Sequence, residues 1–468
     1  MTTSTRVPGP AGLPLLGSMF DLKRDSLGTY LAARRAHGDV VRFTAGPPGL
    51  RMELYAVFSA EGAQQILATD SANFRKDNAF YQEIRESFGN GLLTSQDEDY
   101  LRQRRLMQPL FTRKRVDGYA AAVTDETAGL LDRWSTAPDG TVDVVDEMTR
   151  LALRAVARIL FGTDVEAAVP VVERCFPVIG EYTLRRGYSP VNPPRDWPTP
   201  GNRRAASAME ELYGVCDRII DERRAEGDAA KGDDLLTLLA RAERSAERSE
   251  ENSEENSEES SADGALDASE IRDQVLIFLL AGHETTATSL AFALHLLARH
   301  PEQQSRARAE AVRILGGRTP EAYDLDALPY LTQVLKEAMR LYPAAPVIGR
   351  RAVADAVVDG HTIPAGADVV VAPWVTQRHP RYWEDPDRFD PERFAPGAEK
   401  DRPRYAWFPF GGGPRACIGQ HFSMLESVLA LAMVLSAYEL EAVDQQVPVD
   451  AGITLRPKGP ARCRLRRV

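Results

Sequence analysis

The chain has 468 residues, of which 43 % are hydrophobic, and a formal net charge of −11. This length suggests two or three domains, and the negative charge argues against general affinity for nucleic acid. Four scattered cysteines are too few for a disulfide scaffold or a zinc cluster, which indicates a reducing compartment. The N-terminus lacks signal-peptide character, and we find no stretch of the length that spans a bilayer. We therefore expect a soluble, cytoplasmic protein without a membrane anchor.

The first third of the chain combines short strands with helices. Apolar patterning predicts strands at Val40–Thr44 and Glu53–Phe58, followed by a helix near Glu61–Ala68. The later segment DEMTRLALRAVARILFG places its apolar residues on one helical face. This pattern predicts a helix with Asp146 as its N-cap and Gly162 as its end.

Two segments in the middle of the chain do not fit regular structure. Between Tyr182 and Arg204, four prolines from Pro190 to Pro198 and then Pro200 forbid a continuous helix. We interpret this segment as a lid, with a plain surface connection as the alternative. Residues 244–264 are acidic and contain a repeated Ser-Glu-Glu-Asn tetrad, which predicts a disordered surface loop rather than a partner-binding tail.

Most of the second half is predicted to be helical. A long helix over Ala268–His300 has Asp267 as a possible N-cap and Pro301 as its stop, and another covers Leu328–Leu341. Short β signals follow at Val357–Val371 and near the C-terminus. No glycine-rich nucleotide fingerprint follows a strand. The expected fold class is mainly α with small β-sheets (α+β).

The stretch FPFGGGPRACIG, residues 408–419, precedes a strongly helical run. A cysteine at a helix N-terminus is easily ionised, and the thiolate is the form that binds metals. The glycines at 411–413 let the backbone turn tightly and approach a flat, bulky group, and Arg415 can pair with an anion on that group. The alternative is that Cys417 is a small buried apolar residue.

The loop resembles the cysteine loop of the cytochrome P-450 (heme-thiolate monooxygenase) family. The spacing of Phe410, Gly413, Arg415, Cys417 and Gly419 carries the resemblance. It implies heme b (iron protoporphyrin IX) as the cofactor, with Cys417 as the axial thiolate ligand of the iron. Phe410 would pack beside the sulfur, Arg415 would meet a heme propionate, and Gly419 would lie at the cofactor. A thiolate ligand favours cleavage of the O–O bond.

The helix beginning at Ala268 contains AGHETT at 281–286. The hydroxyl of Thr285 can reach the Ala281 carbonyl one turn back, and we interpret Gly282 as making room beside a cofactor. An ordinary buried helix is the alternative. The segment is similar to the oxygen-binding helix of the same family. By that resemblance the heme lies between this helix and the cysteine-loop helix, Ala281 contacts the heme, Thr285 hydrogen-bonds dioxygen and Glu284 relays protons.

Glu337 and Arg340 share a helix face in LTQVLKEAMRLYP. Alone, such a pair is usually a surface ion pair of little energy. It also resembles the Glu-x-x-Arg element of the family, whose partner arginine corresponds to Arg393 in the PERF stretch. We therefore expect one buried charged network with a structural role.

Further cations are expected to bind the two heme propionates. The segment YLRQRRLMQPLF resembles the propionate-binding helix, which implies contacts from Tyr100 and Arg104, although family members commonly have Trp or His at the position of Tyr100. Arg350 has the spacing of another propionate arginine, with Arg351 as the runner-up. His421 is the nearest alternative iron ligand, but packing is the preferred interpretation of that residue.

The resemblance covers nearly the whole chain, so one domain over residues 1–468 is expected instead of two or three. It implies a monomeric monooxygenase that uses O2, an apolar small molecule, and electrons from a ferredoxin and its reductase. A peroxide-driven peroxygenase, a non-oxidative heme-thiolate enzyme and a heme-based sensor or carrier are the alternatives. The candidate substrate-lining segments are Phe80–Leu93, Tyr182–Pro200, Leu276–Thr285, Pro343–Ile348 and Ala451–Thr454. The candidate docking group for an acidic ferredoxin is Arg102, Arg105, Arg113, Lys114 and Arg115.

Overall fold

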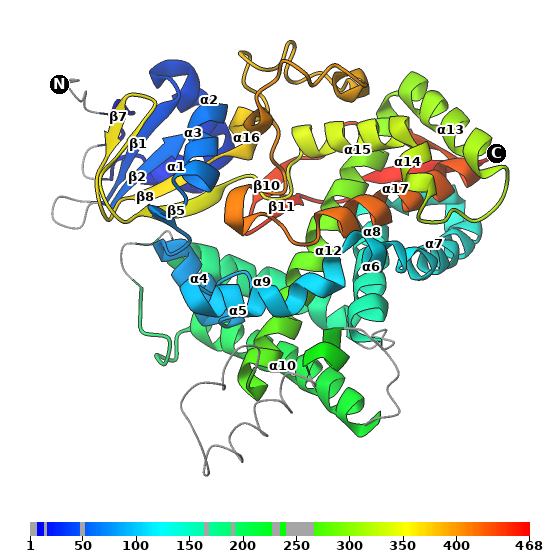
Figure 1. The fold of residues 1–468 in the computed structure, drawn as a ribbon, viewed down its shortest axis with the longest axis horizontal. Helices are drawn as coiled ribbons and strands as arrows, with labels where there is room; N and C mark the ends of the chain where they lie inside the picture. Colours follow the sequence, from blue (N-terminus) through cyan, green and yellow to red (C-terminus); the bar gives the residue numbers. More distant parts are fainter. Residues whose placement is uncertain are drawn as a thin grey trace.

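The computed structural model describes residues 7–13, 16–46, 52–162, 168–187, 189, 192–226, 235–239 and 266–468. A β-rich part and a larger helical part lie side by side (Figure 1). Helices dominate and the sheets are small, so the predicted fold class is confirmed. The predicted acidic loop at 244–264 falls outside the described residues.

The β-rich part is built on a five-stranded sheet in the order β1-β2-β8-β5-β3. All neighbours in this sheet are antiparallel except β2 and β8. A two-stranded sheet of β6 and β7 and four helices complete this part of the molecule (Figure 1). The elements are β1 (Val40–Ala45), β2 (Met52–Val57), β3 (Phe74–Arg75), β5 (Ile348–Ala352), β6 (Ala356–Val358), β7 (His361–Ile363), β8 (Asp368–Val371), α1 (Met19–Arg24), α2 (Ser26–His37), α3 (Ala60–Gln64) and α16 (Pro373–Thr376).

The helical part surrounds the long helix α12 (Ala268–Arg299), which packs on α8, α15 and α17. Buried leucine, valine and alanine side chains fill the space between these helices. The other helices of this part are α4 (Ala79–Phe88), α5 (Asp97–Met107), α6 (Arg113–Asp117), α7 (Ala120–Ser135), α8 (Val144–Val156), α9 (Val169–Gly187), α10 (Pro200–Glu226), α13 (Pro301–Leu315), α14 (Asp324–Ala327), α15 (Pro329–Leu341) and α17 (Gln420–Ala437).

Two small antiparallel sheets lie near the C-terminal end of the chain. One has the order β4-β12-β9 and the other pairs β10 with β11. Their strands are β4 (Thr141–Asp143), β9 (Tyr438–Ala442), β10 (Val449–Ala451), β11 (Leu455–Pro457) and β12 (Arg462–Arg467).

Helix caps show how local sequence fixed the helix ends. Asp267 caps α12 as predicted, and Glu270 completes a capping box with it. The prediction for α8 was wrong in detail, because Asp143 rather than Asp146 accepts from the first turn. Gly162 has a left-handed conformation just after the helical run, which explains why the run ends there.

Two helices contradict the expectation that no segment is long enough to span a bilayer. By length and composition alone, α12 and α17 both qualify. However, 78 % of the apolar window of α12 and 61 % of that of α17 are buried inside the protein. Their apolar character therefore serves the core, where a helix is hydrophobic all round because other helices cover it.

Candidate functional site

Cys417 lies just before α17, not within its first turn. The helix begins at Gln420, so the expected position of the cysteine was wrong by three residues. The backbone N–H of Cys417 donates to the Phe410 carbonyl at 2.9 Å, which places these two residues side by side. His421 turns elsewhere, because its Nε2 lies 3.1 Å from Asp117 Oδ1 on α6.

Protein contacts account for two of the three loop glycines. A Cβ at Gly413, which has φ of +65°, would lie 1.9 Å from the Leu67 carbonyl oxygen. A Cβ at Gly412 would lie 2.4 Å from the ring of Tyr405. The positive φ angles of Gly411 and Gly413 agree with the expected tight turn, and the loop also packs closely on its own protein, which the sequence did not predict.

The Cys417 side chain combines exposure with a close surrounding of protein. The side chain is exposed, although burial by the surrounding protein raises the pKa of its thiol. A side chain has both properties when protein surrounds it but leaves one of its sides uncovered. The Gly419 backbone N–H and the charges of Arg104 and Lys76 oppose this increase in pKa. These groups stabilise a thiolate, which is the form that binds a metal.

Four cations gather near this sulfur, and we call Lys76, Arg104, Arg350 and Arg415 the cation group. Burial lowers the pKa of Lys76 well below its usual value, and the charges of Arg415 and Arg350 lower it further. Burial likewise lowers the pKa of Arg415 to about 10. Within the described ranges, none of the four forms an ion pair with a carboxylate. Such a cluster fits an anionic group, as the two propionates of heme would provide.

Tyr100 and Arg104 on α5 hold the cysteine loop directly. The Tyr100 hydroxyl donates to the Pro414 carbonyl at 2.7 Å and accepts from Arg104 at 2.8 Å. Arg104 also donates to the Ala416 carbonyl at 3.0 Å, and the guanidinium of Arg415 stacks 3.6 Å above the Tyr100 ring. Tyr100 thus has a role in the loop that the sequence did not predict, and its contact with a propionate stays a prediction.

Arg350 and Arg351 are the two candidates for a propionate-binding arginine on β5, and the structure distinguishes them. Alternate residues of β5 face opposite sides, so Arg350 is buried and joins the cation group while Arg351 is exposed. Tyr81, on α4, lies close to Arg350 and opposes the decrease in its pKa that burial causes. Lys76, which directly follows β3, was missed because its neighbours Arg350 and Arg415 are far away in sequence.

On α12, Ala281 is exposed although the five residues before it, Leu276–Leu280, are all buried. The Thr285 hydroxyl donates to the Ala281 carbonyl at 2.9 Å, as expected. Gly282 faces α8, since a Cβ there would lie 2.9 Å from Val156 on that helix. The glycine therefore lets two helices approach closely, and our interpretation that it makes room for a cofactor was wrong.

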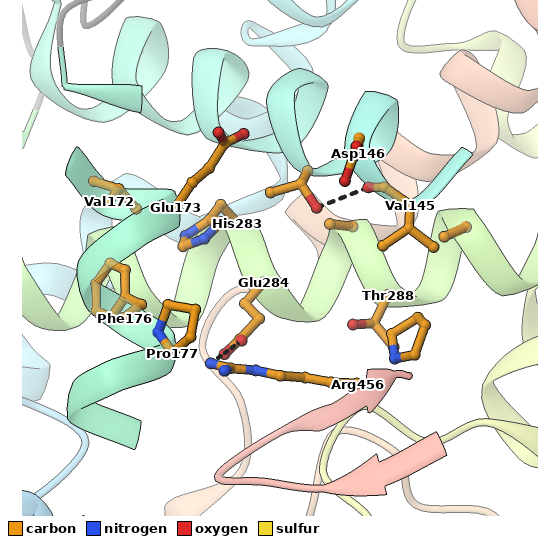
Figure 2. A pocket seen from close by; sticks show the side chains of 14 residues that line it. Val145, Asp146, Val172, Glu173, Phe176, Pro177, His283, Glu284, Thr288 and Arg456 are labelled. Atoms are coloured by element: carbon orange, nitrogen blue, oxygen red, sulfur yellow. Dashed lines mark hydrogen bonds and ion pairs between the residues drawn. The ribbon is translucent and has the colours of Figure 1, made fainter. Parts of the chain in front are cut away.

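Glu284 points away from Thr285, its neighbour in the sequence. One carboxylate oxygen of Glu284 pairs with Arg456 on β11, and the other is buried without a hydrogen-bond partner. The side chains of Glu284 and Arg456 line a cavity between α8, α9, α12 and β11 (Figure 2), and Thr285 does not. The two residues predicted to act together thus face different surroundings.

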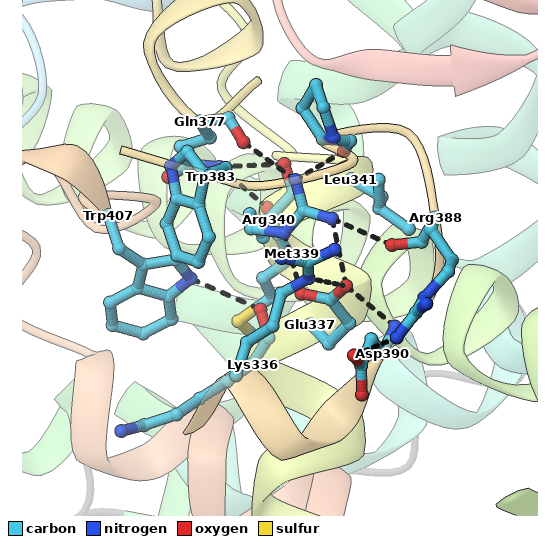
Figure 3. A network of polar contacts seen from close by, with 12 residues as sticks. Lys336, Glu337, Met339, Arg340, Leu341, Gln377, Trp383, Arg388, Asp390 and Trp407 are labelled. Carbon is cyan, nitrogen blue, oxygen red and sulfur yellow. Dashed lines mark hydrogen bonds and ion pairs between the residues drawn. The ribbon is translucent and has the colours of Figure 1, made fainter. Parts of the chain in front are cut away.

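The predicted charged network is confirmed (Figure 3). Arg340 donates to both oxygens of Glu337 at 2.6 and 2.8 Å, and both side chains are fully buried. Arg393 lies 3.5 Å from the same carboxylate. Arg340 also donates to the Gln377 carbonyl, and the Gln377 side chain accepts from the Phe408 N–H at 2.9 Å. The network thereby fixes the start of the cysteine loop, and Gln377 is a link that the sequence did not reveal.

The proline-rich segment is anchored where the structure describes it. Glu83 on α4 accepts from Arg186 at 2.9 Å and also from Arg195. Asn202 donates to the carbonyls of Pro194 and Trp197, both at 2.8 Å. These contacts tie α4 to the connection between α9 and α10, and a lid function of this segment stays a prediction.

Comparisons with known proteins identify the family. The cytochrome P450 family model matches residues 7–463. The chain belongs to the cytochrome P450 family. It is 36 % identical to cyclooctat-9-en-7-ol 5-monooxygenase of Streptomyces melanosporofaciens, over 94 % of this chain and 90 % of the relative. It is 34 % identical to pentalenene oxygenase of Streptomyces avermitilis, over 100 % and 98 % of the two chains. The crystal structure of the cytochrome P450DA heme domain matches with a TM-score of 0.84 and 26 % identity, covering 99 % of this chain and 98 % of that one.

The protein is accordingly an oxidoreductase, a cytochrome P450 monooxygenase with a heme-iron cofactor. The family uses O2, a small-molecule substrate and redox partners. The exposed thiol and the cation group fit such a cofactor, because together they provide a soft metal ligand and partners for two carboxylates.

Proposed function

We propose that this cytochrome P450 oxygenates a cyclic terpenoid. The relatives named above are a cyclooctat-9-en-7-ol 5-monooxygenase and a pentalenene oxygenase, both aligned over nearly the whole chain. The observation that carries the oxygenase role is the exposed Cys417 thiol beside four cations that lack carboxylate partners within the described ranges. We further propose a single domain over residues 1–468 and a cytoplasmic, monomeric protein without a membrane anchor.

The residues around Cys417 form the proposed heme b site. Cys417 would hold the heme iron through its thiolate, with Phe410 and Gly419 beside the sulfur. The cation group would bind the propionates, with Tyr100 supporting Arg104 and Arg415. When bound, heme supplies the activation of O2 and the transfer of one oxygen atom to substrate.

We propose that α12 delivers protons and lines part of the substrate pocket. Cleaving the O–O bond to release water requires two protons in a site that excludes solvent. Thr285 presents its hydroxyl next to the exposed Ala281, where it can hold a proton for dioxygen. After Thr285 has passed on its proton, the carboxyl group of Glu284 supplies the next proton to Thr285. The apolar side chains of the candidate lining segments orient the substrate.

Thr285→Ala is expected to uncouple NAD(P)H consumption from product formation. Without the hydroxyl, no side chain at this position holds the proton that O–O cleavage needs, so product per NAD(P)H falls by about tenfold or more while NAD(P)H consumption continues. Ser289→Ala is the matched control, because Ser289 makes the same type of bond, to the Thr285 carbonyl at 2.9 Å, on the same helix. Equal coupling in the two variants would contradict the role of Thr285.

Binding spectra test the proposed substrate class. A panel of cyclic sesquiterpenes and diterpenes, with fatty acids and steroids of similar size, is titrated against the purified holoprotein. We expect the terpenes to shift the Soret band at lower concentrations than the other compounds, and NAD(P)H with redox partners to convert them to oxygenated products. A response confined to fatty acids or steroids would contradict the terpenoid assignment. Efficient turnover with peroxide alone would favour the peroxygenase alternative.

We propose a ferredoxin and its reductase as the electron donors. The expected docking group is less positive than its sequence suggests, because Arg102 pairs with Glu270 and Arg113 lies 2.7 Å from Asp326. Lys114 on α6 carries a further charge, and α6 lies beside the first turn of α17, since Asp117 is 3.1 Å from His421. An acidic protein would be steered there by long-range attraction.

A further inference from the structure

A second cavity, of about 270 Å3, lies where the C-terminal ends of α12 and α15 meet residues 378–389. Neither Cys417 nor the cation group lines it, so it is separate from the proposed heme site. It opens to solvent, because several of its lining residues are exposed. Three arginines face a single carboxylate among its ionisable lining residues, which are Arg299, His300, Tyr342, Arg378, Asp387 and Arg388.

Arg378 is the buried cation of this cavity. Its side chain is 9 % exposed, and its Cζ lies 3.7 Å from the centre of the Trp374 ring. Its carboxylate partner is Asp387, 3.3 Å away, whose own side chain is 77 % exposed. Burial and the charge of Arg340 lower the pKa of Arg378 to about 10. The exposed carboxylate therefore compensates the buried charge only in part.

The ends of the two helices explain some of these cations but not all of them. Arg378 donates to the Leu341 carbonyl at the end of α15, and Nδ1 of His300 lies 2.7 Å from the Leu296 carbonyl in the last turn of α12. Cations are favourable at such ends because the last carbonyl groups have no partner within the helix. Arg299 is different, since its side chain is exposed and has no hydrogen-bond or ion-pair partner within the described part of the chain.

The buried charged network holds the wall of this cavity in place. Arg340 donates to the Pro386 carbonyl at 2.6 Å and to the Arg388 carbonyl at 3.1 Å (Figure 3). The Arg388 side chain pairs with Asp390 at 2.6 Å. The backbone that carries Asp387 and Arg388 is therefore fixed before a ligand arrives, and a preorganised site loses less entropy on binding than a mobile one.

We propose that this cavity binds a phosphate ester of an aromatic or other apolar group. Guanidinium groups match phosphate oxygen atoms in geometry and charge, so Arg299 and Arg378 donate to the phosphate. The rings of Tyr342 and Phe389 form an apolar side of the cavity and contact the organic part of the ester. The dianion supplies the compensation that Asp387 gives Arg378 only in part. This site is independent of the oxygenated substrate.

Phenyl phosphate is the probe, titrated by calorimetry into the heme-loaded protein at constant ionic strength in a buffer without phosphate. Inorganic phosphate and benzoate are the comparisons, because each has only one half of the recognised chemistry. We expect phenyl phosphate to bind about tenfold more tightly than either. The Soret band stays unchanged, since the ester does not enter the heme site. Affinity no greater than that of benzoate or of inorganic phosphate, or a Soret shift at the same concentrations, would overturn the proposal.

Two substitutions with opposite expected effects locate the site. Arg299→Met removes a free donor and weakens the binding of phenyl phosphate by about tenfold. Asp387→Asn removes the competing carboxylate and strengthens binding by about threefold. Arg313→Met is the matched control, because Arg313 is also an exposed arginine in the last turn of its helix, α13, but does not line the cavity. Unchanged affinity in Arg299→Met, an equal loss in Arg313→Met, or weaker binding in Asp387→Asn would contradict this site.

Thermal unfolding gives a second readout, because a ligand that binds only the folded protein raises the unfolding midpoint. We expect excess phenyl phosphate to raise the midpoint of the parent and of Arg313→Met equally, and that of Arg299→Met by less. Neither arginine belongs to the charged network, so both variants are expected to keep the parent's midpoint without ligand. An equal rise in all three proteins would place the bound ester elsewhere and overturn the proposal.

Discussion

Cys417→Ala abolishes the red-shifted Soret band that the reduced protein forms with carbon monoxide. That band reports thiolate ligation, and the alanine variant has no sulfur at position 417, where the side chain is exposed. We expect monooxygenation to be lost completely in this variant, because it lacks the thiolate that would favour O–O cleavage. The measurement is the difference spectrum of the reduced protein with and without carbon monoxide.

The other cysteines supply matched controls. Cys216 and Cys463 are buried, and burial raises the pKa of each thiol to about 12, so neither forms a thiolate near neutral pH. Cys216→Ala and Cys463→Ala are expected to keep the red-shifted band. Retention of the band in Cys417→Ala, or its loss in either control, would remove Cys417 from the proposed site.

The second large effect is on stability. Arg340→Met leaves the Glu337 carboxylate fully buried, with Arg393 at 3.5 Å as its remaining cation. It also removes the donors to the carbonyls of Gln377 and Pro386. We expect the free energy of unfolding to fall by about 3–5 kcal/mol, since breaking one side of a buried ion pair leaves an uncompensated charge. Urea titration followed by circular dichroism measures this change.

An exposed ion pair serves as the control for this prediction. Arg464 and Glu441 are paired across β12 and β9 with exposed side chains, so Arg464→Met is expected to cost less than about 1 kcal/mol. The Arg340→Met protein is also expected to bind heme poorly, because the network positions Gln377, which holds the start of the cysteine loop. A loss in Arg340→Met no larger than in Arg464→Met would contradict the structural role of the network.

Features fixed by neighbours in sequence were predictable. Asp267 caps α12 because its side chain and that of Glu270 need only one helical turn to meet. The bond from Thr285 to the Ala281 carbonyl has the same local origin. The spacing of the cysteine loop was also sufficient to predict the family that the comparisons then identified.

Features fixed by tertiary contacts were not predictable. Lys76 joins the cation group only because the fold brings it to Arg350 and Arg415. Glu284 faces Arg456 because β11 lies against α12, and no local pattern relates residues so far apart in sequence. Glycines were misjudged for the same reason. The sequence shows that a side chain is absent, whereas the structure shows that Gly282 meets Val156 and Gly413 meets the Leu67 carbonyl.

Iron X-ray absorption of the purified, heme-loaded protein measures directly whether Cys417 binds the iron. We expect one sulfur atom in the first coordination shell of the iron, and the loss of that sulfur in Cys417→Ala. A shell of nitrogen and oxygen atoms alone in the parent protein would show that the metal is held by another residue, and would contradict the assignment of Cys417 and the function built on it.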